Sequence, residues 1–244
     1  MSLPIAVVYE ADADFQIATE VADRVFCEMI DYIEPEVLDA YRTWIGTIAA
    51  REKLTWSNLP RLAREIGIKA HGHFDGIPAE ADAIAARRAI RFLLKSFPGL
   101  NAIVLIRDQD DQPQRRTGLE QARNEHRGCP VIIGLAIPER EAWVVSGFEP
   151  QDEAERVRLD DERQKLGFHP HERSHELTAG KDDSALRSPK RVLRELCCGD
   201  FERERQCWNH TPLEMLRKRG TKNGLAMYLN EVLIPLAPLL GHVS

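Results

Sequence analysis

The acidic run Asp108-Gln109-Asp110-Asp111 follows directly on the apolar stretch Ile103–Ile106. Four branched apolar residues in succession predict a buried strand, so the carboxylates fall at its C-terminal end. Alternation along a strand places Asp108 and Asp110 on one side, about 7 Å apart, where they could share a hard divalent cation. The alternative is a polar exit from a strand into a loop, because aspartate is common in turns.

Two further apolar stretches, Ile5–Tyr9 and Val131–Ile137, also lead into acidic segments. The carboxylates that follow them include Glu10, Asp14, Glu139 and Glu141. In a parallel sheet the C-terminal ends of all three strands meet at one edge. Carboxylates crowded together there are unstable without a cation. The set therefore predicts a site that depends on a metal ion.

The ions predicted for this site are Mg²⁺ or Mn²⁺, since carboxylate oxygens suit hard divalent cations. The predicted metal ligands are Asp108 and Asp110 after the strand 103–106, and Glu139 and Glu141 after the strand 131–137. Arg140 could instead pair with one of its two glutamate neighbours. Asp111 lies beside the first pair of ligands, and Asp14 either joins the site or caps the helix that follows the first strand.

Four basic residues are candidates for holding phosphate groups. They are Arg107, Arg115, Arg116 and Lys181. The alternative for the two arginines after the acidic run is a solvated helix face. Histidines form another cluster, His169-Pro170-His171 with His175, for which structural zinc is conceivable although the spacing matches no standard zinc finger. The sequence does not decide whether this cluster binds zinc.

The chain has 244 residues, a hydrophobic content of 43% and a formal net charge of −6. This size suits one α/β domain with a helical extension, and the mild acidity excludes a general polycation that coats nucleic acid. The cysteines are odd in number and form no Cys-x-x-Cys pair, which indicates reduced thiols. Without a basic leader or a long apolar span, we expect a cytoplasmic protein that has no membrane segment.

Strands that alternate with helical patterns predict an α/β fold, a mostly parallel sheet flanked by helices. Apolar residues at spacing four, among them Ile17, Val21 and Val25, predict a helix over 15–32. Further helices are predicted at 35–52, 79–97, 112–127, 189–197, 212–219 and 225–240. A turn is predicted at His71–Gly76.

The same patterns predict two parts of the chain. Residues 1–148 should form one α/β domain that carries the three acidic segments, with a helical insertion at about 34–97. Residues 149–244 should form a polar loop and a helical C-terminal extension packed on that domain. The loop prediction rests on residues 149–183, which are strongly polar and show no convincing core pattern.

The three acidic segments together resemble the Toprim domain, the fold shared by topoisomerases, primases and related nucleases. That family carries a glutamate at the end of its first strand and an Asp-x-Asp motif at the end of a later one, which match Glu10 and Asp108/Asp110. The segment Pro138–Trp143 is similar to the Glu-x-Glu-Ala-Trp stretch of the DUF4276-type Toprim-related proteins. The resemblance covers about residues 3–148. Ala11 departs from it, since a glycine usually follows the first glutamate.

This resemblance implies a metal-dependent nuclease or nicking enzyme that acts on phosphodiester bonds, in a bacterial defence or mobile-element system. It assigns catalytic roles to Glu10, Asp108 and Asp110, with Glu10 as a metal ligand or as the general acid or base. It favours DNA over RNA as the substrate and suggests a partner ATPase, because the chain has no Walker A motif. Two alternatives stay open: a non-catalytic or partner-dependent subunit of an ATPase–nuclease complex, and a phosphohydrolase acting on a small nucleotide.

Overall fold

The computed structural model describes residues 2–48, 52–178 and 180–241. The chain divides into two compact units. Unit 1 comprises Met1–Arg107, Gln112–Gly134 and Asn230–Ser244, and unit 2 comprises Asp108–Asp111 and Leu135–Leu229. The acidic run of the sequence is thus a short segment of unit 2 inserted between two segments of unit 1. The predicted domain boundary at residue 148 stays a prediction.

Unit 1 is built on a parallel four-stranded sheet with the strand order β2-β1-β7-β8. The strands are β1 (Leu3–Val8), β2 (Arg42–Ile45), β7 (Ala102–Asp108) and β8 (Val131–Ala136). The register aligns Ile5 of β1 with Trp44 of β2 and with Ala102 of β7. Most residues of β1, β7 and β8 are buried, which is why these strands read as continuous apolar runs rather than as alternating patterns.

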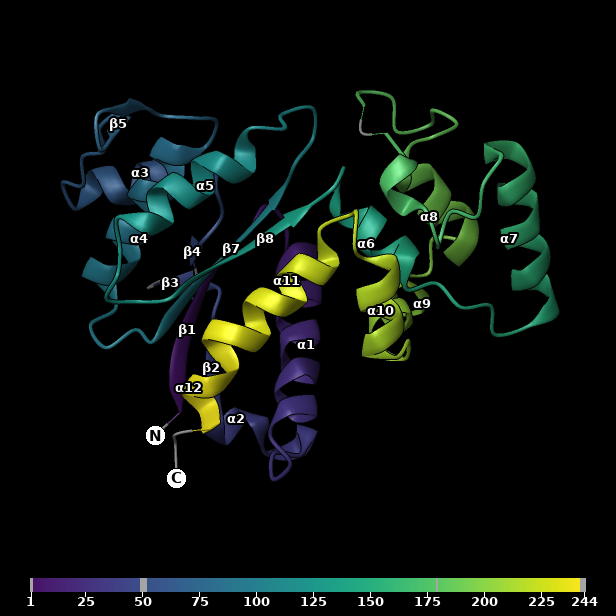
Figure 1. Cartoon of the computed structure of the whole chain (residues 1–244), viewed down its shortest axis with the longest axis horizontal. Helices are drawn as coiled ribbons and strands as arrows, with labels where there is room; N and C mark the ends of the chain where they lie inside the picture. Colours follow the sequence, from purple (N-terminus) through teal and green to yellow (C-terminus); the bar gives the residue numbers. More distant parts are fainter. Residues whose placement is uncertain (1, 49–51, 179, 242–244) are drawn as a thin grey trace. The chain divides into compact units, whose positions relative to one another are not determined.

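Helices cover both faces of this sheet (Figure 1). In unit 1 they are α1 (Asp12–Met29), α3 (Leu59–Glu65), α4 (Ala83–Ser96), α5 (Arg115–Asn124), the π-helical turn η4 (Val232–Leu236) and α12 (Ala237–Gly241). On one face α1 packs against η4 and α12, and on the other α4 packs against α3 and α5. The stripe Ile17, Val21 and Val25 of α1 is fully buried. The predicted α/β class, a mostly parallel sheet flanked by helices, is confirmed.

The helix predicted over 35–52 is wrong. The chain forms two short helical turns, η1 (Pro35–Val37) and α2 (Leu38–Tyr41), and then the edge strand β2. β-branched and aromatic residues in β2 favour a strand, and pairing with β1 overrides the helix-like apolar spacing. The short strands β3 (Thr47–Ile48) and β4 (Glu52–Lys53) then pair in antiparallel fashion. Residues 49–51 of the predicted helix lie outside the described residues.

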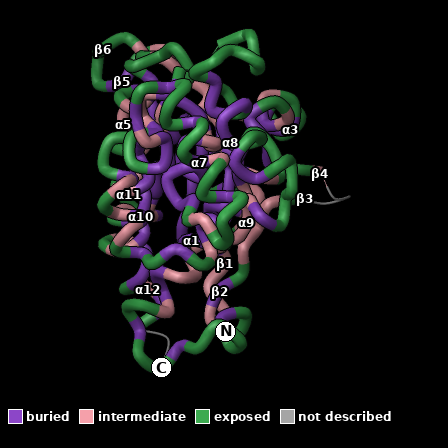
Figure 2. Tube along the Cα trace, turned by 90° about the vertical axis from the view of Figure 1, so that its right-hand side faces the viewer, coloured by how far each residue is buried: buried purple, intermediate pink, exposed green. Residues whose placement is uncertain are grey.

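The turn predicted near His71–Gly76 is confirmed as a short hairpin. Its strands are β5 (His73–Phe74) and β6 (Ile77–Pro78). Asp75 and Gly76 between them both have positive φ values, +47° and +82°, as a tight two-residue hairpin turn requires. Much of this hairpin is exposed (Figure 2).

Unit 2 is helical. Its helices are α6 (Arg140–Ser146), α7 (Glu153–Leu166), η3 (Ser174–Glu176), α8 (Pro189–Cys197), α9 (Phe201–Asn209) and α10 (Leu213–Arg219), and α11 (Leu225–Glu231) begins in this unit. Helix α6 packs against η3, α8 and α9. Its Trp143 is fully buried, stacks on Tyr228 and donates a hydrogen bond to the Asn223 carbonyl (2.7 Å). Among the described residues of the whole chain, no helix is long and apolar enough to cross a membrane.

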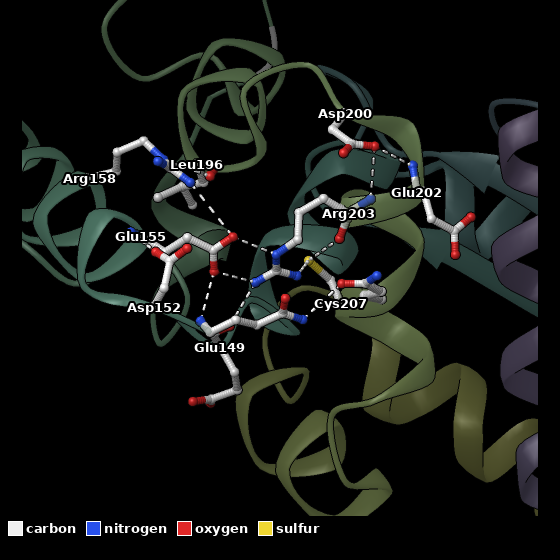
Figure 3. A network of polar contacts seen from close by, with 11 residues as sticks. Glu149, Asp152, Glu155, Arg158, Leu196, Asp200, Glu202, Arg203 and Cys207 are labelled. Atoms are coloured by element: carbon white, nitrogen blue, oxygen red, sulfur yellow. Dashed lines mark hydrogen bonds and ion pairs between the residues drawn. The ribbon is translucent and has the colours of Figure 1, made fainter.

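Residues 149–183, predicted as a polar loop, contain the helix α7. Its buried side includes Glu155 and Glu162, which pair with Arg203 of α9 (2.7 Å) and Arg191 of α8 (2.6 Å). Figure 3 shows the first of these pairs. Hydrophobic periodicity could not predict this helix, because ion pairs take up positions that apolar residues usually occupy.

Candidate functional site

The acidic run after β7 is tied to the segment that leads from β8 into α6. The backbone N–H of Gln109 donates to the Ala136 carbonyl (2.8 Å), and that of Asp110 donates to the Pro138 carbonyl (3.0 Å). The carboxylate of Asp108 accepts a hydrogen bond from the N–H of Arg140 (2.8 Å), the first residue of α6. These bonds place the acidic segments that follow the two strands next to each other within unit 2.

A cavity of about 290 Å³ opens at this place in unit 2. It is lined by Asp110, Asp111, Glu139, Gly180 and Lys181. Asp110 has a left-handed backbone with a φ of +51°, which aspartate tolerates better than most residues. Three carboxylates and one ammonium group thus surround a space that could hold a cation together with a phosphate.

Glu139 is the buried member of this set. Only 6% of its surface is exposed, and its Oε2 atom has no hydrogen-bond partner among the described residues. Burial raises the pKa of the Glu139 carboxyl; Lys190 opposes this shift, and Glu141 and Asp110 add to it. A buried carboxylate oxygen without a donor destabilises the fold, and a cation bound in the cavity would remove that penalty.

Other charged groups of unit 2 surround this carboxylate. Glu141, the other predicted ligand of the third segment, forms an ion pair with Arg140 (2.9 Å). Lys190 pairs with Asp183 (3.2 Å), and both act on the Glu139 carboxyl through their charges. No sequence pattern singles out Lys190 and Asp183 for this site, because only the folding of unit 2 brings them near a residue more than 40 positions earlier.

The predicted residues of unit 1 form an ion-pair chain. Glu10 pairs with Arg107 (3.1 Å), and Arg107 also contacts Asp82 (3.0 Å). The same Asp82 carboxylate pairs with Arg115 (2.6 Å), which is buried. The guanidinium of Arg107 lies over the ring of Trp56. Asp82 was not predicted, yet this single carboxylate holds two of the arginines proposed for phosphate binding.

Asp14 accepts hydrogen bonds from the backbone N–H groups of Glu10 (3.2 Å) and Ala11 (2.7 Å). It therefore has the helix-capping contacts expected of an acid in the first turn of α1. Arg116 pairs with Glu231 (2.7 Å) and with Glu120 on its own helix (2.8 Å). All three predicted phosphate-binding arginines thus have carboxylate partners, whereas Lys181 lines the cavity of unit 2.

Among the described residues, no three side chains of His, Cys, Asp or Glu are placed to hold a metal ion together, and this includes the histidines His169, His171 and His175. The polar groups of the unit 2 cavity nevertheless fit a hard cation. Its carboxylates offer only oxygen ligands, and Oε2 of Glu139 is a buried acceptor without a donor. Mg²⁺ and Mn²⁺, the ions predicted from the sequence, prefer such oxygen ligands, as Ca²⁺ also does.

Comparison with known proteins finds no matching family model, no matching curated protein and no matching solved structure. The fold defines the class: an α/β protein with a parallel four-stranded sheet between helices. The resemblance to the Toprim family rests on the sequence motifs and stays a prediction.

Proposed function

We propose that this protein is a Mg²⁺- or Mn²⁺-dependent nuclease of the Toprim type, which cleaves phosphodiester bonds of nucleic acid. The observation that carries this proposal is the cavity of unit 2, where Asp110, Asp111 and Glu139 lie together with Lys181. Carboxylates and an ammonium group around one cavity suit a phosphate that is bound beside a divalent cation.

Glu139 and Asp110 would supply oxygen ligands to the cation, since both line the cavity and Glu139 has a buried oxygen without a donor. Asp111 lines the same cavity, and water would complete the coordination of the ion. Bound Mg²⁺ or Mn²⁺ would neutralise charge on the phosphoryl oxygens and make a bound water more acidic. Lys181 would donate to a phosphate oxygen. Asp108 fixes the first residue of α6 through its bond to the N–H of Arg140, and so positions the neighbouring Glu139.

The Toprim resemblance extends the proposal beyond this cavity. It supports catalytic roles for Glu10 and Asp108 and a metal-binding role for Glu141. It also supports DNA rather than RNA as the substrate, a cytoplasmic protein, a partner ATPase, and use in bacterial defence or by mobile elements.

The proposal is tested by incubating supercoiled plasmid and single-stranded RNA with the full chain in Mg²⁺, Mn²⁺ or EDTA. Asp110→Asn is the sharpest variant, because asparagine tolerates a left-handed backbone and keeps the side-chain size while the charge is lost. Asp160→Asn on α7 is the matched control, since this exposed aspartate pairs only weakly with Arg163 (3.4 Å). We expect metal-dependent cleavage that falls by about 100-fold or more in Asp110→Asn and Glu139→Gln and is unchanged in the control.

Three other outcomes would redirect the proposal. Cleavage that survives in EDTA or in Asp110→Asn would contradict it. No cleavage under any condition, with a Mg²⁺-dependent rise in Tm that Asp110→Asn abolishes, would favour a partner-dependent subunit. Hydrolysis of a dinucleotide without cleavage of either polymer would favour a phosphohydrolase acting on small nucleotides.

A further inference from the structure

A second cavity lies in unit 1, beside residues 66–73, which run from the end of α3 to the first residue of the hairpin β5–β6 and are called the loop 66–73 below. Three basic residues of α4, spaced four positions apart, hold this loop by donating hydrogen bonds to its backbone carbonyls. The hydrogen bonds run from Arg87 to the carbonyls of His71 and His73, from Arg91 to that of Lys69, and from Lys95 to that of Ile66. Residues four apart share one face of a helix, so one basic stripe of α4 supports the whole loop.

The cavity has a volume of about 380 Å³, and its charged lining is entirely basic. The polar side chains around it are Arg64, Lys69, His71 and Arg88. No acidic residue is part of the described lining. Within the described residues, no carboxylate pairs with Arg64, Lys69 or Arg88.

Other arginines of unit 1 differ from these. Arg42 pairs with Asp23 (2.7 Å), and Arg115 pairs with Asp82 (2.6 Å). On a chain with a formal net charge of −6, three cations without carboxylate partners around one cavity create a local positive potential. That potential favours an anionic ligand, which would meet no acidic group in the described lining.

We infer that this cavity binds phosphate groups of a nucleic-acid backbone. Guanidinium and ammonium groups are the side chains that bind phosphate oxygens most strongly. The basic surface is longer than one phosphate, because Arg88, Arg91 and Lys95 follow one another along one side of α4 over about 10 Å. Arg91 and Lys95 each retain donors after their single bonds to the loop. A row of cations of this length fits a chain of phosphates better than a free phosphate ion.

The contact should not depend on base sequence. No Phe, Tyr or Trp belongs to the described lining, whose only aromatic ring is the imidazole of His71, so the cavity lacks the large aromatic surface on which successive bases usually stack. Contacts to phosphates position a nucleic acid without reading its bases. This inference goes beyond cleavage at the unit 2 cavity and does not rest on it, because phosphate binding by arginine and lysine needs no metal ion.

The test is binding of a fluorescent oligonucleotide of about 20 nucleotides, as single strand and as duplex, followed by anisotropy in EDTA at several salt concentrations. The site variant Arg64→Gln/Lys69→Gln/Arg88→Gln removes the three cations. The control variant Arg156→Gln/Arg163→Gln/Arg194→Gln removes the same charge from exposed positions of unit 2. We expect the site variant to bind about 10-fold or more weakly, its salt slope to fall by about 2–3, and the control to stay within about twofold.

Equal losses in the site and control variants would overturn the inference, because binding would then follow net charge alone. Undiminished binding by the site variant, or no binding by the wild type, would also overturn it. Heparin tests the ligand class: binding of heparin as tight as that of DNA, with the same dependence on the three cations, would overturn the assignment to nucleic acid. Binding without cleavage would support the inference while the proposed nuclease activity fails.

A second variant keeps the test decisive if the triple variant does not fold. Lys69 is exposed and its ammonium group makes no hydrogen bond or ion pair within the described residues, so Lys69→Gln should leave the fold intact. Its salt slope should fall by about one unit. An unchanged slope in this folded variant would overturn the inference.

Discussion

Glu139 and Glu155 are two glutamates of unit 2 that are buried to nearly the same extent, with 6% and 5% of their surfaces exposed. Glu155 accepts two hydrogen bonds from the guanidinium of Arg203, at 2.7 and 2.9 Å (Figure 3). It accepts a third from the N–H of Gln151. Glu139 has a buried oxygen with no such partner among the described residues. Hydrogen bonding by Arg203 lowers the pKa of Glu155, whereas burial raises the pKa of Glu139.

The comparison separates two uses of a buried carboxylate. The charge of Glu155 is matched inside the fold, and the pair joins α7 to α9. The charge of Glu139 is not matched in this way, so ionising it destabilises the protein until a ligand supplies the missing partner. Burial is common to both glutamates, so it is the missing partner of Glu139 that supports the proposal of a ligand at this carboxylate.

Removing the partner of Glu155 should have the largest effect. In Arg203→Gln the buried carboxylate loses its guanidinium, and we expect the free energy of unfolding to fall by about 3–5 kcal/mol. Urea denaturation followed by circular dichroism measures this change. Arg163→Gln on α7 is the control, because its ion pair with Asp160 is long and exposed (3.4 Å), and it should lose less than about 1 kcal/mol. Similar losses in both variants would remove the contrast between the two glutamates.

Binding of a cation at Glu139 should have the next largest effect on the free energy of unfolding. By mass action, Mg²⁺ at about 100 times its Kd should raise the free energy of unfolding by about 2.7 kcal/mol. Thermal unfolding over a Mg²⁺ series measures the gain. Glu139→Gln and Asp110→Asn should lose most of it, and Asp160→Asn should keep it. A full gain in Glu139→Gln would mean that the ion binds elsewhere.

His171 extends the comparison to a group that becomes cationic. It is buried, its Nδ1 atom has no hydrogen-bond partner among the described residues, and burial together with Arg219 lowers its pKa to about 4. The unfolded chain therefore takes up this proton first, and stability falls as the pH drops from about 6.5 to about 4. We expect a loss of about 2 kcal/mol by about pH 5 that His171→Gln does not share. Urea denaturation at several pH values measures the free energy of unfolding of the wild type and of His171→Gln. The same dependence on pH in both proteins would contradict this prediction.

Glu139→Gln without metal should show the smallest change, with the opposite sign of pH dependence. Because the pKa of Glu139 is raised in the folded state, stability is lost as the pH rises through the window between the unfolded and folded pKa values. In EDTA we expect the variant to be more stable than the wild type by about 1 kcal/mol at about pH 8 and equal to it below about pH 4. Glu155→Gln should instead be less stable than the wild type at about pH 8. If Glu139→Gln is instead less stable than the wild type, the Glu139 carboxylate has a stabilising partner inside the fold, as Glu155 does.

Sequence patterns locate the charged groups of this protein well. Continuous apolar runs that end in Asp or Glu predict β1, β7 and β8 together with the acidic segments after them, because a strand buried on both faces needs no alternation. The apolar stripe of α1 is equally local, since residues four apart meet on one helix face. Such features follow from short stretches of the chain.

The partner of each charged group could not be predicted in this way. Arg116 and Glu231 pair across 115 positions, and Asp82 joins two arginines that lie far from it in the sequence. For the same reason α7 could not be predicted, because its buried glutamates have the sequence pattern of surface residues. Nor does the sequence distinguish Arg64, Lys69 and Arg88 from arginines and lysines that form ion pairs. Tertiary contacts decide which charges remain available to a ligand, and these contacts need the folded structure.

Helix α4 holds the loop 66–73 through main-chain carbonyls. Every amino acid carries that carbonyl, so the attachment is indifferent to the identity of the loop residues. Lys69 and His71 can therefore be substituted by other amino acids while the loop stays attached to α4. The side chains of the loop residues take no part in this attachment, so natural variation or a designed library could change them one at a time and alter the lining of the inferred phosphate-binding cavity while the loop stays attached to α4.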